Sequence, residues 1–287
     1  MDWTPRRERF RTLLSGDRCI HPGSVFDPIS GRIAQDLGFE AGMFAGSIAS
    51  LTVLGAPDLA LISLTEFAGQ VLRICRACTL PLIVDADHGY GNALGVRRTV
   101  EELETAGVAA LTIEDTALPA RYAAAGATQL VRIEEGVGKM RAALDARQDP
   151  DLVIVGRTGA AAVTGVADAI ARALAYEAAG VDALFFAGLK TRGELDAIAS
   201  AVRLPIMLGS VGPALMDRDT LSALGVRVCL QGHQPFMAAV RAVHDTLKAL
   251  REGTAPAQIP GIASAELMQR VTRGDDYGRW TREFLGE

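Results

Sequence analysis

Two aspartates, Asp85 and Asp87, mark the part of this chain with the clearest chemical potential. The apolar residues Leu82–Val84 before them are typical of a buried strand, and Gly89 and Gly91 follow. Because side chains alternate along a strand, we expect the two carboxylates on the same side of the sheet. Such a pair repels unless a cation or proton lies between its members, and Mg²⁺ or Mn²⁺ prefers oxygen ligands of this kind. The alternative is an exposed pair that caps the next helix.

Residues suited to metal or anion binding also stand at the ends of other predicted strands. In chain order, these ends carry Gly46 and Ser47, Asp85 and Asp87, Glu114 and Asp115, Arg157, and Gln231-Gly232-His233. Acidic groups followed by cationic or proton-handling groups suit a metal ion and an anionic substrate. Structural interpretations stay open, since Arg157 could bridge to Glu114 and His233 could be a hydrogen-bonded core histidine. Asp58 is expected to be a turn residue unless a metal lies nearby. His21 and His88 are expected to be structural or to support the residues that bind the ligand, and His244 is expected at the surface.

Eight short apolar segments that alternate with helical patterns would position these residues. The predicted strands are 18–21, 41–45, 82–85, 109–114, 152–157, 183–187, 206–208 and 226–230. Predicted helices between them include 95–106, 133–146, 166–179 and 191–201. Glycines such as Gly107 and Gly180 separate a helix from the next strand, as in repeated strand–helix units. Eight such units predict an α/β fold, a (β/α)8 TIM barrel, whose active site lies at the carboxyl ends of the strands.

Length and composition fit one domain without a nucleic-acid or membrane surface. We expect a single barrel domain over 1–287, with 255–287 a C-terminal helical tail in subunit contacts. The net charge of −5 offers no basic surface for nucleic acid or an anionic membrane. The N-terminus has no continuous apolar segment, so a cytoplasmic protein is expected. Cys75 and Cys78 form a C-x-x-C within a helical pattern, and buried thiols are expected rather than a zinc or redox site.

The motifs resemble those of the isocitrate lyase and phosphoenolpyruvate mutase superfamily. The resemblance rests on the segments 45–58, 85–91, 111–115 and 156–158, which include D-A-D-H-G-Y-G and I-E-D, and it extends over essentially the whole chain. It implies a tetrameric barrel that binds Mg²⁺ and α-keto or α-hydroxy acids. By position, it implies that Asp85 binds the metal and that three further carboxylates surround the ion, partly through water: Asp87, Glu114 and Asp58. Ser47 and Gly46 would hold the substrate carboxylate, and Arg157 would bind the substrate.

Departures from these motifs indicate a branch of the superfamily. Its lyases carry K-x-C-G-H after the I-E-D strand, whereas residues 115–126 contain neither cysteine nor lysine, and the asparagine of the phosphonate-forming mutases is also missing. The segment 231–233, with 26–28 and 134–139, is similar to the oxaloacetate decarboxylases of the superfamily. One difference is Ser210-Val211-Gly212, which stands where members of that group can have a tyrosine.

The resemblance thus implies Mg²⁺-dependent decarboxylation of oxaloacetate to pyruvate and CO₂ through a metal-stabilised enolate. Arg157 and His233 are the expected catalytic residues, which would orient the substrate, contact the enolate or hold the departing carboxylate. The alternatives are a 2-alkylmalate or methylisocitrate-type carbon–carbon lyase, another α-keto acid enzyme of the superfamily, or a catalytically idle binding protein. We also expect a homotetramer and no catalytic cysteine.

Overall fold

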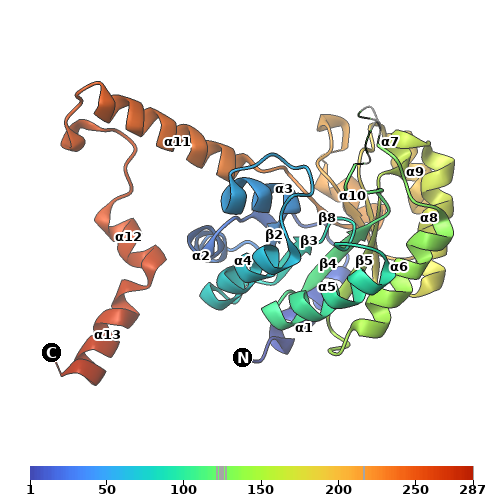
Figure 1. Cartoon of the computed structure of the whole chain (residues 1–287), viewed down its shortest axis with the longest axis horizontal. Helices are drawn as coiled ribbons and strands as arrows, with labels where there is room; N and C mark the ends of the chain where they lie inside the picture. The colour runs from blue at the N-terminus through green and yellow to red at the C-terminus, as the bar shows by residue number, and fades with distance from the viewer. Residues whose placement is uncertain (121, 123–125, 127, 216, 287) are drawn as a thin grey trace.

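The computed structural model describes residues 1–286 except 121, 123–125, 127 and 216, and it contains a parallel sheet curled into a barrel (Figure 1). The strands pair in chain order: β1 (Gly23–Ser24), β2 (Gly42–Phe44), β3 (Leu82–Asp85), β4 (Ala110–Glu114), β5 (Val153–Thr158), β6 (Ala183–Phe186), β7 (Ile206–Leu208) and β8 (Val226–Cys229). An isolated parallel bridge between Ile20 and Val228 joins the two ends of the sheet. There, Ile20 N donates to Arg227 O at 2.9 Å and Cys229 N donates to Ile20 O at 3.0 Å. The predicted (β/α)8 barrel is confirmed.

The first strand lies later in the chain than predicted. The prediction placed it at 18–21, but only Ile20 of that segment pairs, and β1 itself is Gly23–Ser24. Pro22 stands between the bridge and β1, and proline has no N–H with which to continue a ladder of hydrogen bonds. As a result, Ser24 rather than His21 ends the first strand and lies at the active-site end of the barrel.

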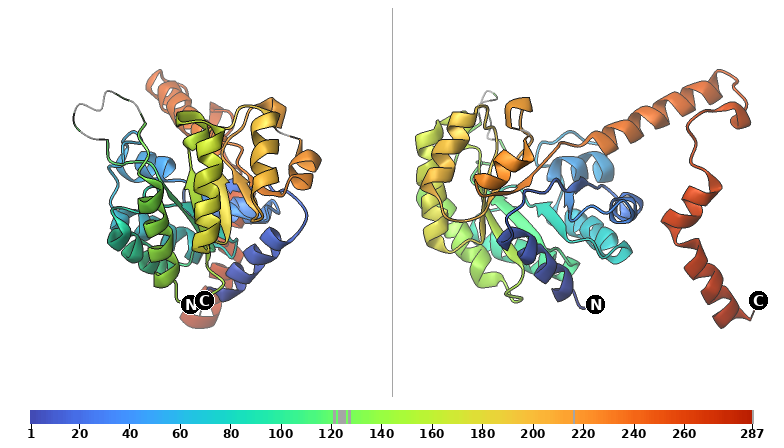
Figure 2. Two further views of the ribbon diagram at one scale, coloured as in Figure 1. Left: turned by 90° about the vertical axis from the view of Figure 1, so that its right-hand side faces the viewer. Right: turned by 180° about the vertical axis from the view of Figure 1, so that it is seen from behind.

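Helices cover the outside of the sheet on most of its circumference (Figures 1 and 2). They are α2 (Pro28–Asp36), α4 (Leu64–Ala77), α5 (Ala93–Ala106), α6 (Ile133–Ala146), α8 (Val166–Ala179), α9 (Arg192–Ala201) and α10 (Arg218–Ala223), with the short α3 (Gly46–Ala49), the π-helical turn Ser50–Leu54 and α7 (Ala160–Val163) at the strand ends. Every residue of β3 and β4 is buried, as expected for a parallel sheet covered by helices. Helices α5 and α8 end at Gly107 and Gly180 in the left-handed conformation, as the sequence predicted.

Helix α1 (Thr4–Ser15) lies at the end of the barrel opposite the strand carboxyl ends. Its Arg7 donates to the carbonyl oxygens of Val108 and Glu104, at 3.0 and 2.6 Å, and pairs with Asp149 at 2.6 Å. These partners precede β4 and β5, so the arginine ties the helix to the amino ends of two strands.

The helix after β8 does not cover the barrel. Helix α11 (Gln234–Arg251) projects away from it, and none of its residues is buried (Figures 1 and 2). The tail then returns as α12 (Ala265–Thr272), which contacts α2: Arg32 donates to Val271 O at 3.0 Å, and Arg273 pairs with Asp36 at 2.6 Å. Helix α13 (Gly274–Leu285) ends the described chain. Within the described residues, no helix combines the length and apolar character needed to span a membrane.

Candidate active site

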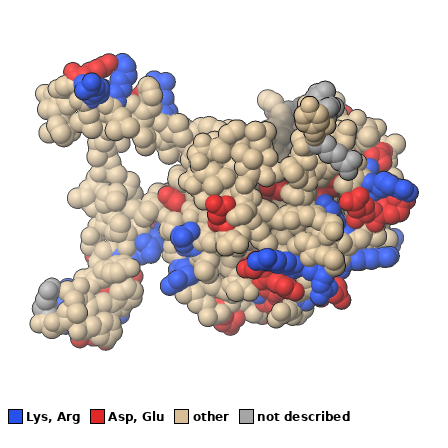
Figure 3. Space-filling view, viewed as in Figure 1, with Lys and Arg blue, Asp and Glu red and all other residues tan. Residues whose placement is uncertain are grey.

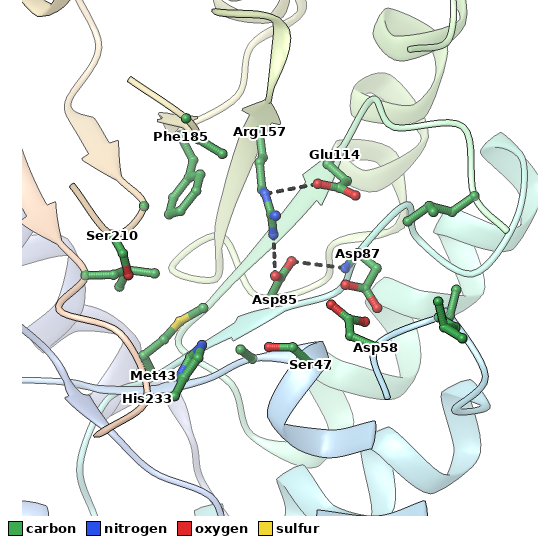
Figure 4. Close-up of a pocket in the computed structure, with 18 of the residues that line it drawn as sticks. Met43, Ser47, Asp58, Asp85, Asp87, Glu114, Arg157, Phe185, Ser210 and His233 are labelled. Atoms are coloured by element: carbon green, nitrogen blue, oxygen red, sulfur yellow. Dashed lines mark hydrogen bonds and ion pairs between the residues drawn. The ribbon is translucent and has the colours of Figure 1, made fainter. Parts of the chain in front are cut away.

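A cavity of about 630 Å³ lies at the carboxyl ends of the strands (Figure 4). Its polar lining comes from several strands and loops: Ser47, Asp58, Asp85, Asp87, Glu114, Arg157, Ser210 and His233. Apolar side chains, among them Met43, Phe185 and Leu230, form the rest of the wall. The structure therefore brings the predicted site residues together. Gly46 lies just behind the lining, where an added Cβ would be 2.6 Å from Oδ2 of Asp87, so only glycine leaves room for that carboxylate.

Asp85 and Asp87 reach the cavity in different ways. Asp85 is the last residue of β3, whereas Asp87 lies beyond the strand with a φ of +47°. Both carboxylates line the cavity, as expected. Strand alternation is not the reason, because Asp87 lies in the turn after the strand. The turn holds Asp87, because Asp87 N donates to Asp85 Oδ1 at 3.1 Å and Glu114 N donates to Asp87 O at 2.8 Å.

Arg157 lies between the acidic side chains (Figure 4). Its Nη1 pairs with Asp85 Oδ2, and its Nε lies 3.1 Å from Glu114 Oε2 as an ion pair without hydrogen-bond geometry. Its guanidinium carbon is 5.3 Å from the centre of the Phe185 ring. Arg157 therefore both bridges to Glu114, as the structural interpretation expected, and lines the cavity, as the functional interpretation expected. One guanidinium balances only part of the charge of the surrounding carboxylates.

The carboxylates are crowded enough to retain protons. Burial, reinforced by Asp85, Glu114 and Asp58, raises the pKa of Asp87 to about 8. Burial is also the main cause of raised pKa values at Glu114 and Asp58, with Asp85 adding to both and Arg157 opposing. Because a bound cation would relieve this repulsion, the arrangement has the electrostatic character of a cation site.

The donor set fits a hydrated Mg²⁺ ion rather than a fully ligated metal. Among the described residues, no three Asp, Glu, His or Cys side chains are arranged to ligate one ion directly. Mg²⁺ usually keeps several waters and takes one or two carboxylate ligands, so a directly ligated cage is not required. Of the predicted metal residues Asp85, Asp87 and Glu114, all three line the cavity, and Asp58 joins them.

His233 lies on the opposite side of the cavity at the start of α11. Its Nδ1 is 2.9 Å from Ser24 Oγ, which leaves Nε2 as the other polar atom of the ring. Burial lowers the pKa of His233, with Asp85 opposing, so the neutral ring is favoured near pH 7. Ser24 was missed because the first strand was predicted too early, and a correct strand end would have identified it.

Other candidate residues have structural positions. Asp115 is fully buried and accepts hydrogen bonds from Arg172 at 3.1 Å and from Tyr176 at 2.8 Å. His21 Nδ1 donates to Cys229 O at 2.8 Å. His244 is exposed on α11 beside Asp245, as predicted for a surface histidine.

The four cysteines are free and buried, at positions 19, 75, 78 and 229, and burial raises the pKa of Cys75 to about 12. None of them is among the described residues that line the cavity.

The loop after β4 contributes Leu118, Pro119 and Ala120 to the cavity wall. Residues 121, 123–125 and 127 of this loop lie outside the described residues. After β7, Ser210 lines the cavity at the segment where members of the decarboxylase group can have a tyrosine, and Val211 packs partly against the core.

The whole chain is similar to known proteins. A family profile described as phosphoenolpyruvate phosphomutase matches residues 10–251. An oxaloacetate decarboxylase of Rhodopseudomonas palustris (strain BisB18) is 62% identical over 286 residues, which cover 100% of this chain and 99% of that protein.

Two solved structures have similar folds across nearly the whole chain. An oxaloacetate acetylhydrolase in complex with 3,3-difluorooxalacetate superposes with a TM-score of 0.85 at 27% identity, covering 98% of this chain and 97% of that one. A phosphonopyruvate hydrolase in complex with oxalate and Mg²⁺ superposes with a TM-score of 0.84 at 28% identity, covering 98% and 99%.

Proposed function

The chain belongs to the phosphoenolpyruvate phosphomutase family, and from this premise we propose that it catalyses Mg²⁺-dependent decarboxylation of oxaloacetate to pyruvate and CO₂. The observation that carries the proposal is that one cavity combines crowded carboxylates with Arg157 and His233. The carboxylates suit a cation, and the other two residues suit a dianionic substrate. The full-length similarity to an oxaloacetate decarboxylase supports the choice of substrate.

The carboxylate cluster would hold the metal ion. Asp85 would be its protein ligand, with Asp87, Glu114 and Asp58 around it, partly through water. Mg²⁺ bound there would supply Lewis-acid stabilisation of the negative charge that develops on the C2 carbonyl oxygen. Arg157 pairs with Asp85 and Glu114 in this structure, so its guanidinium lies beside the carboxylates that would hold the ion.

The substrate carboxylates would meet the remaining polar groups. The Ser47 hydroxyl and the backbone N–H groups near Gly46 would bind the C1 carboxylate. Arg157 and the neutral His233 would orient the substrate, contact the developing oxyanion or hold the C4 carboxylate before it leaves. Met43, Phe185 and Leu230 would limit water in the cavity, which strengthens the electrostatic interactions within it.

Decarboxylation does not need a proton donor in the loop after β4, whereas the other lyase reactions do. The C3–C4 bond breaks, its electron pair remains with the three-carbon product, and CO₂ leaves without a proton. The product then takes its proton at C3 from water or a nearby group. A lyase that releases a carbanion needs a positioned acid, and the described lining contains no cysteine to act as one.

The test is metal-dependent pyruvate formation from oxaloacetate, measured by coupling to NADH oxidation. We expect a rate far above that of the same free Mg²⁺ concentration in buffer, loss of this rate with a chelator, and its return on adding Mg²⁺ or Mn²⁺. A parallel assay should follow cleavage of 2-alkylmalates and methylisocitrate. Faster turnover of those acids, or a rate equal to the buffer background, would overturn the proposal.

A further inference from the structure

Lys139 is a buried cation behind the cavity that the proposed reaction does not use. It lies on α6 with 3% of its surface exposed, and its Nζ donates to the carbonyl oxygen of His88 at 2.9 Å. Among the described residues, no carboxylate oxygen lies within 4.0 Å of Nζ. A buried ammonium group without an ion pair lowers the stability of the fold. A specific role for Lys139 would explain why it is buried here.

The partner of Lys139 belongs to the turn that carries Asp87. Four successive carbonyl oxygens of this turn are held from different directions. The oxygens of residues 86, 87, 88 and 89 accept hydrogen bonds from Gly89 N (2.8 Å), Glu114 N (2.8 Å), Lys139 Nζ (2.9 Å) and Thr99 Oγ1 (2.9 Å). One donor therefore comes from each of four elements: the turn itself, β4, α6 and α5.

The turn needs this support because its backbone conformation is unfavourable. Asp87 and Tyr90 have φ values of +47° and +55°, a region that residues other than glycine rarely adopt. Such a residue carries a conformational cost and persists only where its surroundings hold it. Gly89 between them, at φ +80°, has no room for a side chain, because a Cβ would lie 2.4 Å from Val96.

We propose that Lys139 is a positioning residue for the cation site: its hydrogen bond to the His88 carbonyl oxygen holds the 85–91 turn in the conformation that presents Asp87 to the cavity. The lysine touches neither the cation nor the substrate, and it acts through the backbone next to Asp87. This inference rests on the cation site of the proposed function.

The two possible roles of Lys139, as a nearby positive charge or as a support for the turn, predict opposite changes in cation affinity when the lysine is removed. If Lys139 acted only as a positive charge near the site, its removal would strengthen binding of a divalent cation, because a repulsive charge is lost. If it holds the turn, its removal should weaken cation binding, because Asp87 is released from its position. The sign of the change in affinity therefore separates the two roles.

The experiment is titration of the metal-free full-length protein with Mn²⁺, followed by electron paramagnetic resonance of the free ion. We expect Lys139→Met to raise the Kd for Mn²⁺ at least tenfold. Lys139→Gln, which keeps an N–H donor without the charge, should give a Kd between those of Lys139→Met and the unaltered protein. Met140→Leu, at the neighbouring fully buried position of α6, is the matched control and should leave the Kd unchanged.

An unchanged or lower Kd for Mn²⁺ in Lys139→Met overturns the inference. If Lys139→Met does not fold, an unchanged or lower Kd in Lys139→Gln overturns it. Circular dichroism and thermal unfolding establish which variants fold. If the unaltered protein binds Mn²⁺ and decarboxylates oxaloacetate while the variants bind equally well, only the role of Lys139 is wrong. If the unaltered protein binds no Mn²⁺, both the proposed metal dependence and this inference are wrong.

Discussion

At the scale of single residues, Asp85 is the side chain on which the interactions of the site converge. It pairs with Arg157, accepts from Thr112 Oγ1 at 3.0 Å and accepts from the backbone of Asp87 at 3.1 Å. Asp85→Asn keeps the shape of the side chain but removes the charge. We expect kcat/KM to fall at least a thousandfold, about 4 kcal/mol, with the far-ultraviolet circular dichroism unchanged. Near-normal turnover by the folded variant would show that the cation is held elsewhere.

The raised pKa of Asp87 predicts that protons compete with the metal. In the metal-free protein this pKa is about 8, so the carboxyl group is largely protonated at pH 7 and must lose its proton when a cation binds. The affinity for Mn²⁺ should therefore fall as the pH is lowered below 8, by up to about tenfold per pH unit. Calorimetry at pH 7 in two buffers with different heats of ionisation should detect proton release. Equal affinities at pH 6 and pH 8 would contradict this expectation.

Arg157 and His233 supply the groups for a dianionic substrate. Arg157→Ala and His233→Ala should each lower kcat/KM by at least about tenfold, or about 1.4 kcal/mol. Steady-state kinetics with oxaloacetate at saturating Mg²⁺ measures the loss. His244→Ala, at an exposed histidine on α11, is the control and should have normal kinetics. Near-normal kinetics in the Arg157 and His233 double variant would show that the substrate does not bind in this cavity.

At the scale of secondary structure, the sequence predicted regular repeats well and special backbone conformations poorly. The bounds of α6 and α8 were predicted as found, because long amphipathic patterns define both helices and Gly180 ends α8. The first strand was misplaced because a two-residue strand carries almost no periodicity and a proline interrupts its approach. The left-handed conformation of Asp87 could not be predicted, because a non-glycine residue adopts it only under tertiary constraint.

Contacts between distant elements were beyond the reach of sequence patterns. Ser24 and His233 are 209 positions apart, and Lys139 is 51 positions from His88. Closure of the barrel brings the first pair together, and packing of α6 beside the turn after β3 brings the second pair together. The site residues at strand ends could be predicted from the sequence. Ser24 and Lys139, which contact His233 and the turn that carries Asp87, could not.

At the scale of the whole molecule, α11 carries an apolar surface that we expect a partner to cover. Its exposed apolar residues recur every three or four positions and so form one stripe along the helix: Met237, Val240, Val243, Leu247 and Leu250. In Figure 3 the charged side chains of this arm gather at its far end, with an uncharged surface nearer the barrel. Continuous apolar surface of this kind is typical of a protein–protein interface.

We therefore expect self-association through α11, and the family resemblance predicts a homotetramer. Light scattering at micromolar concentration should give about four times the chain mass of 30.3 kDa. The pair Val243→Glu and Leu247→Glu should shift the protein to smaller species, whereas Arg241→Glu, on the polar side of the same helix, should not. A mass of one chain for the unaltered protein would contradict the expectation.

The single bridge between Ile20 and Val228 should couple activity to local opening of the fold. Every other neighbouring pair of strands shares at least two paired residues, so this seam has the fewest paired residues in the barrel wall. The contact between Ser24 and His233 crosses it, joining β1 to the segment after β8. Transient fraying there would separate the two side chains while the rest of the core stays folded. Heating should then inactivate the protein reversibly some degrees below its melting temperature, and the amides of Ile20 and Cys229 should exchange with deuterium earlier than those of β4.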